Sequence, residues 1–212
     1  MASEVTSAQT DWALHADLYA FLGNSLLAPL RPDAAMGLDP AFWDAWACDG
    51  ANEHVRSGIA TLKEHAARCA DLPLEQAMQQ VNVEYARLFV GPPKPAAPPW
   101  ETLNRNPDAT CGFGEATFAM RELLRQAGLR LRNENHQYED HLGIELLYLS
   151  ERCRAFAERE PSFEEETAVR EFVRERPLAW VPAFHGRIRE AAPGGYFDGL
   201  VELAWGLLQA EV

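Results

Sequence analysis

The chain is poor in lysine, and its cysteines stand apart from one another. Only two lysines, Lys63 and Lys94, occur among the 212 residues, and neither follows a glycine, which excludes a phosphate-binding loop of the Walker type. The four cysteines form no CxxC pair in a chain too long to be a disulfide scaffold. We therefore expect free thiols and a cytoplasmic protein.

Basic residues in general are few. Acidic residues outnumber them by 32 to 19, and the formal net charge is -13. Because phosphate groups need a basic surface, this charge disfavours nucleic acid or an anionic membrane as the main partner. A cationic partner stays open, and so does the simpler interpretation that the acidic surplus only maintains solubility.

Long apolar runs and catalytic signatures are also missing. Nowhere do 18 apolar residues run uninterrupted, and the first ten residues lack the basic and then apolar pattern of a signal peptide. The patterns GxSxG, HExxH and ExxH are absent, and the last is typical of helical di-iron enzymes. The length predicts one domain over residues 1–212, with enough apolar residues to bury a core.

The feature that is present is helical periodicity. Apolar residues recur at spacings of three and four, and no strand is convincing, so the sequence predicts an all-α fold of about nine to ten helices. Asp11 or Thr10 is expected to cap the first helix, Ser162 and Glu165 have the spacing of a capping box, and Gly128 should follow a helix end.

The helical pattern stops at a proline-rich segment. Five of the 14 prolines fall between Pro92 and Pro99, which argues against regular helix and most sheet pairing there. A structureless segment of this length is uncommon inside a domain and is usually functional or disordered. We predict a long functional loop over residues 91–113, laid against the body of the protein.

An aromatic stripe, formed by Tyr85, Leu88 and Phe89, runs directly into this loop and towards Trp100. Such a stripe at a helix end is more often core than binding site. Beside irregular backbone, however, it could line a groove that accepts a peptide. Both interpretations stay open.

A polar run leads into the helix expected near residue 142. His141 and Glu145, four residues apart, would share a helix face, so a metal site with His136 or Asp140 as a further ligand can be drawn. In the alternative, Asp140 and the acidic Glu139 favour the helix N-terminus, and His141 hydrogen-bonds nearby. The spacing alone does not decide between them.

Three stretches of the chain carry a family resemblance. Residues 84–92 read EYARLFVGP, residues 97–102 read APPWET, and residues 139–146 read EDHLGIEL. In this order they resemble the YxRLFxGP…PPWES and EP(E)DHxGxEL motifs of the TorD/DmsD family of molybdoenzyme maturation chaperones. Residues 112–114 and 180–184 resemble two further family stretches, so the likeness covers most of the chain from about residue 80 onward.

The resemblance implies an all-helical cytoplasmic chaperone, not an enzyme, without cofactor or metal. It implies binding of the twin-arginine signal peptide of a molybdopterin-containing oxidoreductase of the DMSO or TMAO reductase type. Such a chaperone assists cofactor insertion and prevents premature export. Its partners would be the leader and body of that precursor, and the chaperone itself would be a monomer or a domain-swapped dimer.

By position, the resemblance assigns Asp140 and His141 to signal-peptide binding, Tyr85 to the groove, and Pro99 and Trp100 to the loop that frames it. Asp140, with Glu139 and Glu101, would accept hydrogen bonds from the arginines. Tyr85, Leu88 and Trp100 would receive the apolar segment. The complete predicted binding set is Tyr85, Leu88, Phe89, Pro99, Trp100, Glu101, Glu139, Asp140 and His141.

The sequence departs from the family pattern at three positions. Tyr138 lies near the position where the family's second motif often has a proline, Thr102 replaces a serine, and Asn104 lies where an aromatic residue is common.

Two other classes of function stay open beside the chaperone. One is a metal-dependent helical enzyme, and the other is a structural helical adaptor without a peptide groove. The enzyme would use His136, Asp140, His141 and Glu145.

Overall fold

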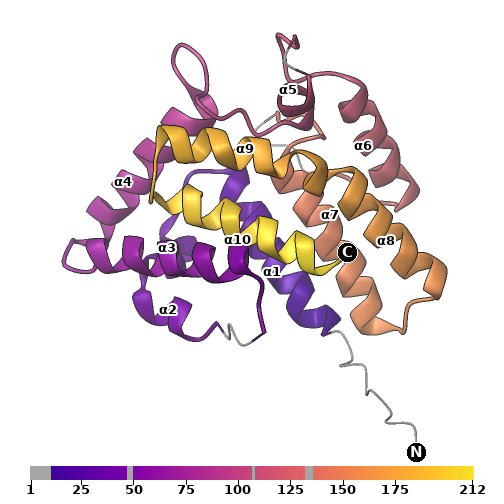
Figure 1. The fold of residues 1–212 in the computed structure, drawn as a ribbon, viewed down its shortest axis with the longest axis horizontal. Coiled ribbons are helices and arrows are strands. Elements are labelled where there is room, and N and C mark those ends of the chain that lie inside the picture. Colours follow the sequence, from indigo (N-terminus) through magenta and orange to yellow (C-terminus); the bar gives the residue numbers. More distant parts are fainter. Residues whose placement is uncertain (1–10, 47–49, 107, 132–135) are drawn as a thin grey trace, which may run out of the picture.

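The computed structural model describes residues 11–46, 50–106, 108–131 and 136–212 (Figure 1). Within these residues the chain forms ten α-helices, one 3₁₀ helix, one short π-helix and no β-strand, which confirms the predicted all-α class. The α-helices are α1 (Trp12–Leu27), α2 (Pro40–Asp44), α3 (Glu53–Cys69), α4 (Leu74–Tyr85), α5 (Glu101–Arg105), α6 (Glu115–Gln126), α7 (Leu142–Glu158), α8 (Phe163–Glu175), α9 (Pro177–Ala191) and α10 (Tyr196–Ala210); the 3₁₀ helix η1 spans Pro32–Leu38 and the π-helix η2 spans Ala86–Val90.

Several helix ends lie where local sequence signals predict them. Asp11 caps α1, because its carboxylate accepts the backbone N–H three residues further on at 3.1 Å; Thr10 lies outside the described residues. Ser162 and Glu165 form the predicted capping box of α8. Gly128 follows α6 with a φ of 70°, the left-handed conformation that glycine adopts without strain.

Two pairs of long helices build the interior. α1 packs along α7, and α3 packs along α10, which also contacts α9 (Figure 1). The apolar faces of these helices meet in one buried cluster, because spacings of three and four place the large side chains on one side of each helix. The largest fully buried side chains include Trp43, Trp180, Tyr19, Tyr196, Phe184 and Phe197.

Glycines allow both helix pairs to approach closely. A Cβ at Gly58 on α3 would lie 2.5 Å from the backbone nitrogen of Leu203 and 2.9 Å from the carbonyl oxygen of Gly199, both on α10. Gly23 on α1 and Gly143 on α7 face each other, and a Cβ on either would lie 2.7 Å from the carbonyl oxygen of the other. Neither contact leaves room for a side chain.

The proline-rich segment differs from the prediction in one respect. No regular helix is expected in residues 91–113, and this is wrong for α5, which lies inside that range. The helix forms because the proline cluster ends at Pro99 and five residues free of proline and glycine follow Trp100. Before α5, the backbone N–H groups of Ala96 and Ala97 donate to carbonyls of η2 and hold the segment against the protein body.

The described cysteines carry free thiols, as expected. Cys69 and Cys153 are buried and Cys111 is exposed, whereas Cys48 lies outside the described residues. No helix in the described ranges combines the length and the apolar character that crossing a membrane requires.

The α3–α10 contact predicts opposite effects for two glycine substitutions. Gly58→Ala forces the new methyl group against α10 backbone and should lower the free energy of unfolding by about 1–3 kcal/mol. Gly186→Ala, in the interior of α9 with open space around it, should instead raise it by up to about 1 kcal/mol through helix propensity. Urea unfolding of both variants tests this, and equal effects would contradict it.

Candidate functional site

The two resembling motifs meet in space although they lie about 40 residues apart. Trp100 and His141 form an isolated antiparallel bridge. On one side of it the backbone N–H of Glu101 donates to the carbonyl of Asp140 at 2.9 Å, and on the other the N–H of Leu142 donates to the carbonyl of Pro99 at 3.0 Å. The backbone therefore joins the proline-rich loop directly to the start of α7.

The Asp140 side chain reinforces this junction. One carboxylate oxygen accepts the backbone N–H and the hydroxyl of Thr102, at 3.0 and 2.7 Å, and the other accepts the hydroxyl of Thr117 at 3.0 Å. Asp140 is fully buried, and burial raises the pKa of its carboxyl while these hydrogen bonds act in the opposite direction. The threonine at position 102 thus supplies a hydroxyl donor, as a serine would.

His141 is the N-cap of α7. Its Nδ1 accepts a hydrogen bond from the backbone N–H of Gly143 at 2.9 Å. The imidazole therefore satisfies an N–H group of the first helical turn that has no partner within the helix. Complete burial lowers the pKa of His141 to about 3, and the ring is neutral at physiological pH. For His141, the interpretation as a helix-terminus residue is confirmed.

Two further buried carboxyl groups lie close to Asp140. Glu101 accepts from the guanidinium of Arg105 at 2.6 Å and from that of Arg176 at 3.0 Å. Glu145 is completely buried, and one oxygen accepts the indole N–H of Trp180 at 3.2 Å, while the other oxygen has no hydrogen-bond partner in the described structure. Burial, and then the charge of Glu101, raise the pKa of Glu145 well above its usual value.

The aromatic stripe belongs to the core. Tyr85, Leu88 and Phe89 are each at most 5% exposed, and the rings of Tyr85 and Phe89 pack against Phe197 of α10. Pro99 is buried as well. These predicted residues are therefore part of the core, and in this structure they present almost no surface to a ligand.

An exposed aromatic cluster lies beside the joined motifs, and the sequence prediction did not include it. Phe113, Phe118 and Tyr138 are 40%, 55% and 38% exposed, with the Phe113 ring centroid 5.0 Å from that of Phe118 and 5.5 Å from that of Tyr138. We call these three residues the aromatic patch. Tyr138 also contacts the half-buried Trp100, at a centroid distance of 6.2 Å. The sequence contains one indication of this cluster, since Phe113 and Phe118 flank Gly114.

Glu139, the remaining predicted residue, lies at the edge of the patch. Its carboxylate forms a two-point ion pair with Arg121, at 2.7 and 3.0 Å, and this arginine holds the pKa of Glu139 below its usual value. The Arg121 guanidinium also lies 5.7 Å from the ring centroid of Phe118. A charged pair therefore borders the exposed rings.

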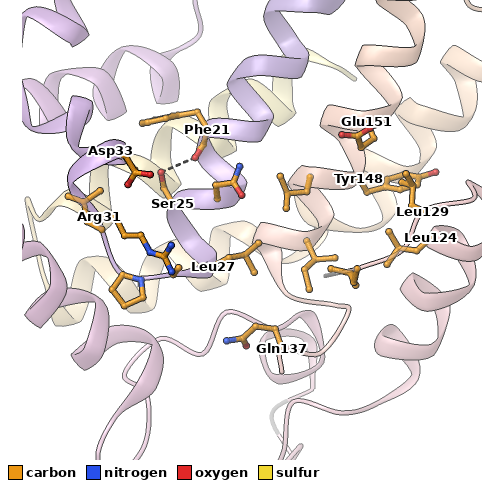
Figure 2. Close-up of a pocket in the computed structure, with 18 of the residues that line it drawn as sticks. Phe21, Ser25, Leu27, Arg31, Asp33, Leu124, Leu129, Gln137, Tyr148 and Glu151 are labelled. Atoms are coloured by element: carbon orange, nitrogen blue, oxygen red, sulfur yellow. Dashed lines mark hydrogen bonds between the residues drawn. The ribbon is translucent and has the colours of Figure 1, made fainter. Parts of the chain in front are cut away.

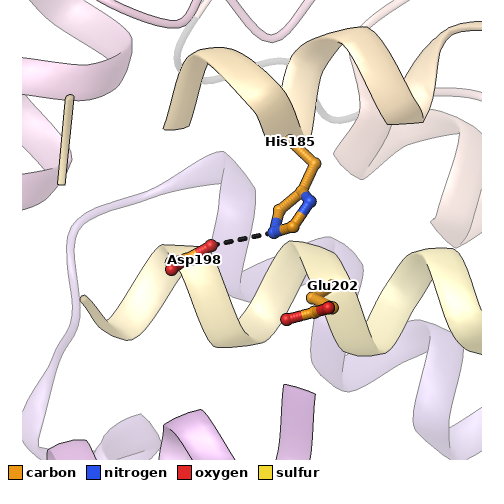
Figure 3. Close-up of side chains that lie close together, drawn as sticks. All are labelled: His185, Asp198 and Glu202. Atoms are coloured by element: carbon orange, nitrogen blue, oxygen red, sulfur yellow. Dashed lines mark hydrogen bonds and ion pairs between the residues drawn. The ribbon is translucent and has the colours of Figure 1, made fainter. Parts of the chain in front are cut away.

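The structure does not assemble the metal site that the alternative interpretation of the sequence requires. Across the described residues, the one group of potential ligands close enough to share an ion is His185, Asp198 and Glu202 (Figure 3), which excludes a cluster of His136, Asp140, His141 and Glu145.

The His185 group is already satisfied by protein contacts. His185 lies 2.8 Å from Asp198, and Arg189 pairs with both carboxylates. The second oxygen of Asp198 accepts the N–H of Gly194. These contacts join α9 to α10, and they leave the group as an ion network rather than a metal site.

Two hollows lie near the site. One groove, of about 810 Å³, runs between the end of α1, η1 and α7, and is lined by residues such as Leu27, Leu124 and Tyr148 (Figure 2); it contains none of the predicted binding residues. The other, of about 1230 Å³, lies between α5, the start of α6 and the junction of α8 and α9. Glu101 and Phe113 both line this second hollow, which we call the Glu101 cavity.

Comparisons with known sequences show the protein family to which the chain belongs. A family model described as nitrate reductase delta subunit matches residues 48–186, and the chain belongs to this family, whose named relatives here are maturation chaperones of the TorD/DmsD type. These relatives are chaperones and not enzymes.

Three relatives illustrate the similarity. The "Probable Tat proofreading chaperone DmsD" of Haemophilus influenzae is 26% identical over 64% of this chain and 63% of its own length. The chaperone protein TorD of Shewanella pealeana is 22% identical over 78% of this chain and 73% of its own. The Tat proofreading chaperone DmsD of Salmonella typhi is 33% identical over 50% of this chain and 45% of its own. The chain thus spans less than two thirds of the first relative.

The buried Glu145 predicts a pH-dependent difference in stability. Because burial raises the pKa of Glu145, the folded chain keeps this carboxyl protonated to a higher pH than the unfolded chain does, so the wild type loses stability as pH rises above the ordinary glutamate pKa. Glu145→Gln cannot ionise, and its stability relative to the wild type should therefore grow by up to about 1.4 kcal/mol per pH unit. Urea unfolding from pH 4 to 8, with the exposed Glu158→Gln as charge control, tests this; a constant difference would contradict it.

Proposed function

We propose that this protein is a single-domain cytoplasmic chaperone for a molybdopterin-containing oxidoreductase of the DMSO or TMAO reductase type. It binds the twin-arginine signal peptide of the precursor, assists cofactor insertion and delays export until insertion is complete. The observation that carries the proposal is the exposed aromatic patch beside the joined motifs. The names of the relatives, Tat proofreading chaperone and chaperone protein TorD, support the same role.

The patch suits the apolar part of such a leader. A twin-arginine leader carries two guanidinium groups followed by an apolar segment that can form a helix. Three adjacent rings with large exposed fractions offer such a segment apolar surface that water otherwise covers. Helix-in-groove recognition places apolar side chains at helical spacing on a surface of this kind.

Asp140 acts in this proposal as a positioning residue. Both of its oxygens already accept hydrogen bonds from Thr102 and Thr117, and its side chain is buried, so a leader arginine has no free oxygen to approach in this conformation. Losing Asp140 would release α5 and the start of α6, which carry Glu101 and the patch residue Phe118. The carboxylate therefore affects leader binding through the segments that it holds.

Phe118→Ser should weaken binding of a synthetic twin-arginine leader by about tenfold, because Phe118 is the most exposed ring of the patch and contributes apolar contact. Phe163→Ser is the matched control, since Phe163 is 79% exposed at the start of α8 and lies outside the patch. Isothermal titration calorimetry measures both. Equal affinities for the two variants would contradict the patch assignment, and a wild type that binds no leader would favour the structural adaptor.

Asp140→Ala should lower the free energy of unfolding by about 2–3 kcal/mol, since the two Thr102 donors and the buried Thr117 hydroxyl lose their carboxylate acceptor. It should also weaken leader binding. Thr117→Val keeps the Asp140 charge and removes the hydroxyl that donates to Asp140 and accepts the backbone N–H of Gly114, so it should weaken leader binding in the same direction. If Asp140→Ala abolished binding while Thr117→Val left both stability and affinity unchanged, Asp140 would contact the leader directly.

A further inference from the structure

Glu101 is a buried carboxylate held by two arginines of the same chain. Its side chain is 2% exposed, and each of its oxygens accepts from one guanidinium, that of Arg105 at 2.6 Å and that of Arg176 at 3.0 Å. A buried carboxylate without a cation is strongly destabilising, so this position requires positive partners at all times. The Glu101 carboxylate thus already binds two arginine side chains of its own chain.

The arginines are more accessible than the carboxylate that they hold. The Arg105 side chain is 48% exposed and that of Arg176 is 20% exposed, and both line the Glu101 cavity. Arg105 makes one further hydrogen bond, to the carbonyl of Glu175 at 3.0 Å. Long side chains of this exposure can turn into water, where the guanidinium is hydrated, without changing the backbone.

The cavity has the charge and the position to receive the arginines of a leader. Its lining contains four acidic residues and three arginines, so it becomes strongly acidic when Arg105 and Arg176 turn outward. Phe113 belongs both to this lining and to the aromatic patch. A peptide whose apolar segment lies on the patch could therefore place its neighbouring cations in the cavity.

We propose that Glu101 is the arginine-binding group for the twin-arginine leader, and that Arg105 and Arg176 occupy it while no leader is bound. This inference rests on the proposed function. Exchange of one guanidinium pair for another keeps the charge-assisted hydrogen bonds to Glu101, so the carboxylate stays paired throughout. The net gain then comes from the apolar segment on the aromatic patch. A lysine ammonium lacks the planar fork of the guanidinium, so a Lys-Lys leader should compete poorly with the internal pair.

Fluorescence anisotropy with a labelled synthetic leader, in Arg-Arg and Lys-Lys versions, tests the internal competition. Arg105→Gln should bind the Arg-Arg peptide about fivefold more tightly than the wild type, because one internal competitor is removed. Glu101→Gln should bind it about tenfold more weakly and lose the preference for Arg-Arg over Lys-Lys. In the Glu101→Gln background, Arg105→Gln should have no further effect. Arg125→Gln, on the exposed pair with Glu122, is the control and should change nothing.

The outcomes separate this inference from the proposed function. A wild type that binds the leader, together with an Arg105→Gln variant of equal or weaker affinity, overturns the internal competition and leaves the chaperone role intact. A wild type that binds neither peptide overturns the proposed function itself. Because Arg105 is half-exposed, its variant is expected to fold, and urea unfolding of Glu101→Gln verifies that its weaker binding does not come from a loss of structure.

Discussion

The hydrogen bonds around Asp140 hold together segments that are far apart in the sequence. Its carboxylate accepts hydrogen bonds from the hydroxyls of Thr102 and Thr117. Its backbone carbonyl accepts the N–H of Glu101, the residue after Trp100 in the proline-rich loop. These contacts fix α5 and the start of α6 against α7. The burial of Glu101 and the exposure of the aromatic patch both follow from that placement, since each depends on where α5 and α6 begin. Bonds to an ionised acceptor suit this purpose, because they are stronger than bonds between neutral groups.

Three buried carboxyl groups lie in this region, and each is stabilised by a different means. Asp140 accepts hydroxyl and amide hydrogen bonds, and Glu101 pairs with two arginines. Burial raises the pKa of Glu145, which favours its neutral form. Three ionised carboxylates at this spacing would repel one another in a medium of low dielectric constant. The division of roles leaves Glu101 as the carboxylate whose partners reach solvent. The acidic surplus of the sequence is therefore partly a set of specific local interactions.

Helices and caps were predictable from the sequence, because they depend on neighbouring residues. Asp11, the Ser162 capping box and the apolar faces of α1, α7 and α10 follow directly from spacing. The pairing of Thr102 with Asp140 could not be predicted, since it joins residues 38 apart whose partners depend on the whole fold. Phe118 was missed because it lies two residues before Met120, about 200° around the helix from the buried face. The family resemblance located the motifs, but it did not distinguish exposed residues such as Tyr138 from buried ones such as Leu88.

The long sequence separation of these contacts has a consequence for the order of folding. The contact between Thr102 and Asp140 joins residues 38 positions apart in the sequence, and the contact between Glu101 and Arg176 joins residues 75 positions apart. Closing such loops costs chain entropy that only tertiary packing repays, so the contacts are expected to form after the local helices. During synthesis, the segment that carries Glu101 emerges well before α7 and the α8–α9 junction. A partly synthesised chain therefore lacks the finished surface until the α8–α9 junction has been made.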